Sequence, residues 1–294
     1  MGLPTETVYG LAADASNPDA VARIFAVKGR PTGHPLIVHG ADVEMLAEWV
    51  ALGPAAEAFT ALATACWPGP LTLIVPRGPR VIDSVTGGRS TVGVRVPAHP
   101  AATDVLLRLG RPAAAPSANL FGQVSPTTAA HVLADLGDLL DPTRDVIVDG
   151  GPAVVGVEST IVDLTVDQPQ VLRAGAIDAA TISRLLDAPV ARAGGPSRAS
   201  GMLAAHYAPR AEVLLADTPE SAAGIAGRER ARGRRVAVVD RTDDLVEAAR
   251  QLYADLRAAD ADGLDAVVVV LPPAEGLGHA LRDRLTKAAA GSRR

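Results

Sequence analysis

The sequence predicts an α/β protein, because short apolar runs alternate with helix-like patterns along its whole length. Its 294 residues correspond to roughly two domains. A hydrophobic content of 48% with 21% charged residues is typical of a chain with packed cores. Because only 3% of the residues are aromatic, we expect cores of Val, Leu, Ile and Ala, and no aromatic platform for single-stranded nucleic acid.

The first predicted helix has a clear start signal. Asn17-Pro18-Asp19 supplies a capping side chain, a proline in the first turn and an acid at the positive end of the helix dipole. The helix pattern runs to about Val27, and apolar strands and further helices then alternate. The predicted strands cover 35–39, 71–75, 92–96, 146–148, 160–162 and 170–173. The other predicted helices cover 41–51 and 54–66, begin at Ser125-Pro126, and end near Leu186.

Residues 188–209 interrupt this rhythm. The stretch 193–197, Ala-Gly-Gly-Pro-Ser, is typical of a flexible linker. Three strand–helix units then follow, with strands predicted at 213–215, 236–239 and 266–271. Since these strands are apolar on both faces, they predict a small parallel sheet covered by helices, a Rossmann-like C-terminal domain. It lacks a G-x-G-x-x-G sequence, so no dinucleotide site is predicted there.

Composition and charge exclude several classes of protein. Cys66 is the only cysteine, which excludes an intrachain disulfide framework and favours a reducing cytosol. No apolar run approaches the ~18 residues of a membrane span, so we expect a cytoplasmic protein without a membrane partner. Residues 1–209 carry 14 basic and 19 acidic residues, and residues 210–294 carry 14 of each. Neither half is therefore a basic nucleic-acid module.

Lysine is rare in this chain, and one of its two lysines is Lys28, in Lys28-Gly29-Arg30-Pro31. A lysine is a compact point charge, whereas an arginine presents a planar fork, so the pair could grip a polyphosphate. The alternative is that Lys28 is a solvated charge at the negative end of the preceding helix. The spacing alone leaves both interpretations open.

Further polar residues stand where strands or helices are predicted to end. They lie in 4–11, in Pro116-Ser117-Ala118-Asn119 after an apolar run, in 156–160 and in 172–175. Open α/β sheets bind ligands beyond the carboxyl ends of their strands. Each segment alone is typical of an ordinary turn, but the whole series favours a binding site.

Together these segments resemble the Sua5/YrdC/YciO family. The matching sequences are Pro-Thr-Glu-Thr-Val-Tyr-Gly-Leu (4–11), Lys-Gly-Arg-Pro (28–31), His-Pro-Leu-Ile-Val-His (34–39), Trp-Pro-Gly-Pro-Leu-Thr (67–72), Val-Gly-Val-Arg-Val-Pro (92–97), Ala-Pro-Ser-Ala-Asn (115–119), Gly-Val-Glu-Ser-Thr (156–160) and His-Tyr-Ala-Pro (206–209). The segments Gly276-Leu277-Gly278 and Asp283-Arg284-Leu285 look like the domain appended in the longer, Sua5-type members.

The resemblance implies a domain organisation. Residues 1–187 would form a YrdC-like catalytic domain with a twisted open mixed sheet, 188–209 a linker that covers the active site, and 210–294 the C-terminal domain. Family members usually carry a further helix and strand before the Pro-Thr-Glu-Thr segment. We therefore expect this chain to lack them.

The resemblance also implies a nucleotidyltransferase activity. The substrates would be ATP, L-threonine and bicarbonate, with Mg²⁺ held through the ATP phosphates and not by protein ligands. The product, threonylcarbamoyl adenylate, would pass to a threonylcarbamoyl-transfer machinery that forms N6-threonylcarbamoyladenosine at position 37 of tRNAs reading ANN codons. Direct contact with tRNA stays open.

Site residues follow from the same resemblance, position by position. The catalytic set would be Lys28, Arg30, Ser117 and Asn119. The ATP-binding set would be Arg30, His34, Thr91, Ser117, Ser125, Arg173, His206 and Tyr207. The L-threonine set would be Thr7, His39, Arg95, Ala115 and Ser159, with the Arg95 guanidinium as partner for the carboxylate.

Two other functions stay open as alternatives. One is a double-stranded RNA or tRNA-binding module, which the acidic balance of residues 1–209 disfavours. The other is a YciO-like relative with weak synthase activity. The complete set Lys28, Arg30, Ser117 and Asn119, together with the second domain, disfavours it.

Overall fold

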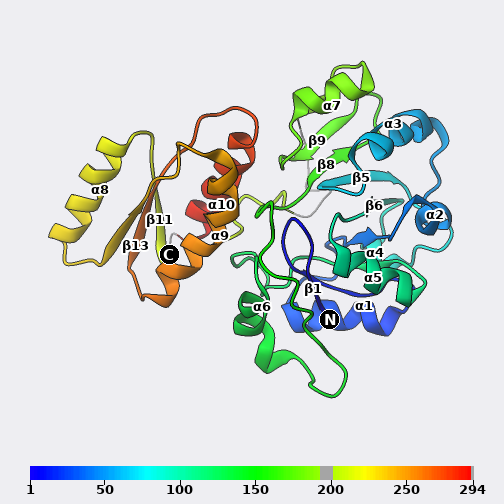
Figure 1. The fold of residues 1–294 in the computed structure, drawn as a ribbon, viewed down its shortest axis with the longest axis horizontal. Helices are drawn as coiled ribbons and strands as arrows, with labels where there is room; N and C mark the ends of the chain where they lie inside the picture. Colours follow the sequence, from blue (N-terminus) through cyan, green and yellow to red (C-terminus); the bar gives the residue numbers. More distant parts are fainter. Residues whose placement is uncertain (193–200, 293–294) are drawn as a thin grey trace.

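The computed structural model describes residues 1–192 and 201–292, and it contains two main sheets (Figure 1). The first has eight strands in the order β10-β9-β8-β5-β6-β4-β7-β3, and the second has three in the order β11-β13-β12. A two-stranded sheet of β1 (Gly2–Leu3) and β2 (Gly10–Leu11) completes the described strands. The α/β class predicted from the sequence is confirmed.

The eight-stranded sheet is mixed, as the family resemblance implied. Its strands are β3 (Ala13–Asp14), β4 (Ile37–His39), β5 (Leu71–Pro76), β6 (Thr91–Arg95), β7 (Ala113–Ala114), β8 (Thr160–Asp163), β9 (Gln170–Arg173) and β10 (Ala191–Arg192). Strand β5 pairs antiparallel with β6 and parallel with β8. Leu73, Val94 and Val162 on these central strands are fully buried, so the core of the first region lies along them.

Helices cover this sheet along its length. They are α1 (Pro18–Lys28), α2 (Val43–Leu46), α3 (Ala56–Cys66), α4 (Asp83–Thr86), α5 (Pro100–Leu109), α6 (Ala129–Leu136) and α7 (Ala179–Leu186), with short 3-10 turns η1 (Ala47–Trp49), η2 (Gly53–Ala55) and η3 (Gly137–Leu139). The start signal of α1 is confirmed, because the Asn17 side chain accepts hydrogen bonds from the backbone of Asp19 and Ala20. Gly29 ends the helix with a φ of +60° and turns the chain immediately after Lys28.

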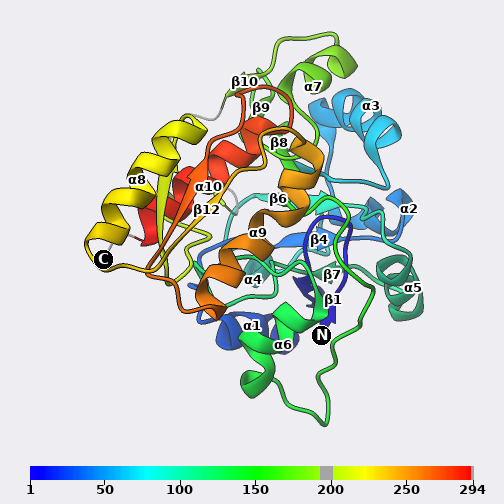
Figure 2. The ribbon, with the colours of Figure 1, turned by 60° about the vertical axis from the view of Figure 1, so that its left-hand side comes forward.

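The C-terminal sheet is parallel, as its apolar strands predicted. Its elements are β11 (Glu212–Ala216), α8 (Pro219–Ala231), β12 (Val236–Val239), α9 (Leu245–Ala261), β13 (Ala266–Val270) and α10 (Gly278–Ser292). Helices α9 and α10 lie on the face toward the first region, and α8 covers the opposite face (Figures 1 and 2). Val8, Val124 and Val157 of the first region are part of the same core as α9 and α10.

Some predicted elements are wrong in detail. The helix expected at Ser125-Pro126 begins at Ala129 with Thr128 as its cap, because the Ser125 hydroxyl donates to Glu158 instead. The strand expected at 146–148 is reduced to one bridge between Ile147 and Gly2. The helix expected at 41–51 divides into α2 and η1.

The linker predicted at 193–197 lies outside the described residues, and the predicted domain boundaries at 187 and 209 stay predictions. Within the described residues, every helix is too short or too polar to span a membrane.

Truncation of a central core side chain tests this architecture. We expect Leu73→Ala to lower the free energy of unfolding by about 2–5 kcal/mol, because the cavity it leaves in β5 is enclosed on all sides. The matched control is Leu107→Ala on α5, which is 57% exposed and should cost about 0.5 kcal/mol or less. Equal losses for both variants, measured by chemical unfolding, would contradict the assignment of the core.

Candidate functional site

A pocket opens where strands β4, β6 and β7 end beneath the loop 5–10 and the segment 201–207. The residues predicted for L-threonine all line it: Thr7, His39, Arg95, Ala115 and Ser159. Half of those predicted for the catalytic and nucleotide sets also line it: Arg30, Ser117, Arg173, His206 and Tyr207. Residues up to 200 positions apart in the sequence therefore meet at one place.

Arg95 at the end of β6 is held on three sides. Its Nη2 donates to Glu6 Oε1 at 2.5 Å, its Nη1 to Thr7 Oγ1 at 2.9 Å, and its Nε to the Gly69 carbonyl at 3.1 Å. Arg95 and Glu6 are both almost completely buried. These bonds fix the plane of the guanidinium, which is the property needed to recognise a carboxylate with two parallel hydrogen bonds.

His39, at the end of β4, is a neutral group beside Arg95. Burial and the charge of Arg95 lower its pKa to about 3, although a hydrogen bond between Nδ1 and the Ile37 carbonyl at 3.0 Å opposes this shift. At neutral pH the ring is therefore uncharged, and it offers the pocket a polar surface without adding to its positive charge.

Ser159 and Arg173 form one wall of the pocket. The Arg173 Nη2 donates to Ser159 Oγ at 3.0 Å, and its Nε donates to the Ser159 carbonyl at 3.0 Å. The Thr72 hydroxyl on β5 shares a hydrogen bond of 2.7 Å with Ser159 Oγ. Backbone and side chain of Ser159 are thus both fixed.

Arg30 brings a further positive charge to the pocket from the turn after α1. It donates to the Pro35 carbonyl at 3.1 Å and lies 5.7 Å from the centre of the Phe121 ring. Burial and the nearby Arg173 lower its pKa to about 10, so it remains cationic at neutral pH. His34 and His206 pack edge-on against the same Phe121 ring, with centroids 5.3 and 6.2 Å away.

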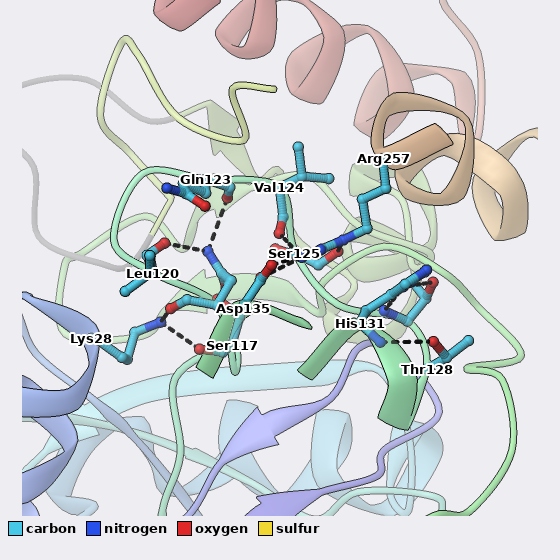
Figure 3. A network of polar contacts seen from close by, with 12 residues as sticks. Lys28, Ser117, Leu120, Gln123, Val124, Ser125, Thr128, His131, Asp135 and Arg257 are labelled. Atoms are coloured by element: carbon cyan, nitrogen blue, oxygen red, sulfur yellow. Dashed lines mark hydrogen bonds and ion pairs between the residues drawn. The ribbon is translucent and has the colours of Figure 1, made fainter. Parts of the chain in front are cut away.

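Lys28 lies behind the pocket wall. Its ammonium donates to the backbone carbonyls of Ser117 and Asn119 at 2.5 Å each, as Figure 3 shows for Ser117. Burial and the charge of Arg30 lower the pKa of Lys28 well below its usual value. The interpretation as a solvated helix-end charge is therefore wrong, because the side chain is buried. The predicted contact with phosphate stays a prediction.

The other predicted nucleotide residues also lie outside the pocket lining. Asn119 donates to the carbonyls of Leu120 and Gln123, which shapes the loop between β7 and α6. Ser125 donates to Glu158 Oε1 at 2.6 Å. Thr91 is at the opposite end of β6 from Arg95 and is half-buried. Their roles in nucleotide binding stay predictions.

His206 and Tyr207 cover the pocket, where the resemblance placed a lid. Their rings pack against each other with centroids 4.1 Å apart, and Tyr207 adopts a φ of +61°. Burial is the main cause that lowers the pKa of His206 to about 4. The Tyr207 hydroxyl is buried without a hydrogen-bond partner among the described residues.

Sequence reasoning missed two buried carboxylates. Glu6 holds Arg95, and Glu158 lines the pocket and accepts from Ser125, Tyr253 and Arg284. Burial opposes ionisation of Glu158, but Arg284, Arg173 and the Ser125 hydroxyl outweigh it and lower its pKa to about 2. Both acids stand inside segments that already suggested a site. Each is the single charged residue of a short segment with no nearby basic residue in sequence, which is the signal that could have found them.

The titration of His39 gives a test by pH. Unfolding restores an ordinary histidine pKa of 6.5, whereas the folded value is about 3. The unfolded chain therefore binds a proton on His39 that the folded chain does not bind. As the pH falls below 6.5, this difference lowers the free energy of unfolding. Between pH 7 and pH 5 we expect His39→Gln to lose about 2 kcal/mol less unfolding free energy than the unaltered chain. If chemical unfolding showed the same loss between pH 7 and pH 5 for the variant and the unaltered chain, the assignment of His39 as buried and neutral would be contradicted.

Comparison with known proteins agrees with this geometry. Residues 1–175 match the Sua5/YciO/YrdC family, described as "Telomere recombination", and residues 176–290 match "Threonylcarbamoyl-AMP synthase, C-terminal domain". The threonylcarbamoyl-AMP synthase of Pyrococcus abyssi is 37% identical over 98% of this chain and 89% of its own length. That of Bacillus subtilis is 39% identical over 99% and 89%.

Solved structures agree as well. The crystal structure of P. abyssi Sua5 complexed with L-threonine superposes with a TM-score of 0.91 at 37% identity, covering 99% of this chain and 90% of that one. The structure of E. coli YciO covers only 62% of this chain, with a TM-score of 0.50 at 26% identity. The chain belongs to the Sua5/YciO/YrdC family, in its two-domain form with a threonylcarbamoyl-AMP synthase C-terminal domain.

Proposed function

We propose that this pocket makes threonylcarbamoyl adenylate from L-threonine, bicarbonate and ATP, with release of pyrophosphate. One observation carries the proposal: the buried arginines Arg95, Arg30 and Arg173 converge on one pocket. The acid in the lining, Glu158, is already paired with Arg284, so the pocket keeps an excess of positive charge. Such a pocket suits an amino-acid carboxylate beside a polyphosphate. The full-length similarity to threonylcarbamoyl-AMP synthases supports the same reaction.

The threonine side of the pocket would be built on Arg95. Its guanidinium is already fixed by Glu6, Thr7 and the Gly69 carbonyl, so it would meet the substrate carboxylate without losing further side-chain entropy. The neutral His39 and the fixed Ser159 would complete this end. That the P. abyssi relative was solved with L-threonine bound supports this assignment.

The phosphate side would be built on Arg30 and Arg173. Two cations whose positions are set by the fold would stabilise the negative charge that develops at the α-phosphorus and on the leaving pyrophosphate. Lys28 would act on this side by holding the Ser117 and Asn119 carbonyls, which orients the loop that presents the Ser117 hydroxyl.

The chemistry requires positioning more than it requires an enzyme nucleophile. The threonine nitrogen forms a bond to the carbon of CO₂ derived from bicarbonate and loses a proton, which gives a carbamate. A carbamate oxygen then bonds to the α-phosphorus, and the bond from that phosphorus to the bridging oxygen of pyrophosphate breaks. Pyrophosphate leaves with the electron pair. Holding the two reactants together supplies much of the rate enhancement.

Magnesium would enter with ATP. The two carboxylates at the pocket, Glu6 and Glu158, are already hydrogen-bonded to Arg95 and Arg284. The phosphate oxygens are therefore the better ligands, and Mg²⁺ commonly binds substrate phosphates while keeping several waters. The ion would supply additional charge neutralisation on the phosphates.

Nucleotide entry would require movement of the covering segment. With His206 and Tyr207 in place the cavity measures about 50 Å³, whereas ligand sites commonly measure ~300–1,000 Å³. Once the segment closed again, it would exclude water from the labile carbamate and the mixed anhydride. The product would then pass to a threonylcarbamoyl-transfer machinery that modifies adenosine 37 of tRNA.

The two alternatives are weaker. The hypothesis of a double-stranded RNA or tRNA-binding module does not explain the buried arginine pocket. The hypothesis of a YciO-like relative does not explain the C-terminal domain. Similarity to threonylcarbamoyl-AMP synthases over both domains disfavours both alternatives.

Omission of single substrates tests the proposed reaction. We expect threonylcarbamoyl adenylate and pyrophosphate to form only when ATP, L-threonine and bicarbonate are all present, because the carbamate carbon comes from bicarbonate. Product would be identified by mass spectrometry in buffer freed of CO₂. Undiminished product without bicarbonate would exclude the reaction, and salt-sensitive binding of duplex RNA without any product would favour the RNA-binding alternative.

The role of Arg95 is tested by Arg95→Lys. Lysine keeps the charge but cannot bind Glu6, Thr7 and a carboxylate with one planar fork. We expect the KM for L-threonine to rise about 10- to 100-fold and the KM for ATP to change less than about twofold. Arg80→Lys, in an exposed ion pair with Glu48, is the matched control and should behave as the unaltered chain. A larger effect on ATP than on threonine would reverse the assignment of the two ends.

A further inference from the structure

The segment Asp283-Arg284-Leu285 on α10 has no place in the reaction described above, yet it reaches the pocket. Arg284 is fully buried, and its Nε donates to Glu158 Oε2 at 2.8 Å. Its Nη1 donates to Asp283 at 2.7 Å, and its guanidinium lies 5.2 Å from the centre of the Tyr207 ring. One side chain of the C-terminal domain thus contacts both the pocket wall and the pocket cover.

Glu158 receives a second bond from the C-terminal domain. Tyr253 on α9 is fully buried, and its hydroxyl lies 3.0 and 2.9 Å from the two Glu158 oxygens. The next residue, Ser159, is the one held by Arg173 and Thr72. A shift of Glu158 would therefore displace the wall formed by Ser159 and Arg173.

The approach of α9 explains why the pocket segment begins with a glycine. Gly156 has a φ of +83°, and a Cβ atom there would lie 2.2 Å from the Ala249 carbonyl oxygen and 2.5 Å from Arg250 Cα. The Arg250 Nε donates to the Val154 carbonyl at 2.8 Å, and the Val155 amide donates to the Glu6 carbonyl at 2.8 Å. The docking of α9 is thus connected to Glu6, which holds Arg95.

The pocket cover is tied to α10 by the second lysine of the chain. Lys287 lies one turn after Asp283, and its ammonium donates to the Gly201 carbonyl at 2.6 Å. Its own carbonyl accepts from the His206 amide at 3.3 Å. Both ends of the described covering segment therefore bond to this one helix.

Arg257 on α9 supports a different part of the same site. Its Nη1 donates to Asp135 Oδ1 at 2.9 Å and its Nη2 to the Val124 carbonyl at 2.5 Å (Figure 3). Val124 belongs to the loop that Lys28 and Asn119 shape at its other end. The C-terminal domain thus contacts the back of the pocket at several points. Two of its side chains, Arg284 and Tyr253, join wall and cover, since the Tyr253 ring also packs against the Tyr207 ring with centroids 5.7 Å apart.

We infer that Arg284 is a positioning residue for the pocket, which places the Ser159–Arg173 wall through Glu158 and the cover through Tyr207. The inference deepens the proposed function, and its meaning for catalysis rests on that function, whereas the coupling itself is a property of the fold. Arg284 touches no reacting atom, so its effect must act through the position of other groups.

The experiment compares Arg284→Lys with Arg282→Lys in the full chain. Both residues lie on α10, but Arg282 donates to the Pro272 carbonyl, away from the pocket. For Arg284→Lys we expect the KM for L-threonine to rise at least about fivefold, with a smaller fall in kcat. For Arg282→Lys we expect both constants to stay within about twofold of the unaltered chain.

Hydrogen–deuterium exchange gives a readout that does not need activity. In Arg284→Lys, peptides covering 156–163 and 201–209 should exchange faster, while a peptide covering 266–270 on β13 should not change. The double variant Glu158→Gln/Arg284→Met, which removes both buried charges together, should lose less activity than the product of the losses in the two single variants.

Two outcomes overturn the inference. One is kinetics and exchange in Arg284→Lys that equal those of Arg282→Lys. The other is faster exchange that is equally large in 266–270, which would show a general loss of stability. If the unaltered chain made no threonylcarbamoyl adenylate, the proposed function would fail, and the exchange of 156–163 and 201–209 would still decide the role of Arg284.

Discussion

The structure depends on one buried carboxylate, Glu158, which joins the first region to helices α9 and α10 of the C-terminal domain. It accepts hydrogen bonds from Ser125 in the first region and from Tyr253 and Arg284 in the second. A buried charge is tolerated only when partners replace its hydration. Burial raises the pKa of Glu158, but Arg284, Arg173 and the Ser125 hydroxyl more than offset this and lower it to about 2. The pocket wall, the pocket cover and the C-terminal helices therefore hold one another in place.

Fixed hydrogen-bond partners also explain how several positive charges can be buried close together. Arg95, Arg30, Arg173 and Lys28 are buried within one region, and each donates to a carbonyl, hydroxyl or carboxylate whose position is set by the fold. Their positions decide which of them can contact a substrate. Arg95, Arg30 and Arg173 line the pocket and can meet an anionic substrate there, whereas Lys28 holds backbone carbonyls behind it. His39 and His206 stay neutral because burial and these cations lower their pKa values.

Much of the fold could be predicted because its signals are local. The Asn17 cap and the apolar strands of the C-terminal sheet both depend on neighbouring residues. The errors arose where tertiary contacts decide: Ser125 resembles a helix cap but donates to Glu158, so the helix begins later, at Ala129. The pocket lining was predicted from matching segments. Arg284 was not, because its partner is 126 residues away and no spacing reveals such a pair.

The central claim is that a pocket fixed from behind by the C-terminal domain presents Arg95 to an amino-acid carboxylate. The most direct measurement is a crystal structure of the full chain with L-threonine. We expect the threonine carboxylate within hydrogen-bond distance of the Arg95 guanidinium, between His39 and Ser159, while Glu158 keeps its bonds to Tyr253 and Arg284. Threonine bound elsewhere, or bound with Arg95 still turned only to Glu6 and Thr7, would contradict the account.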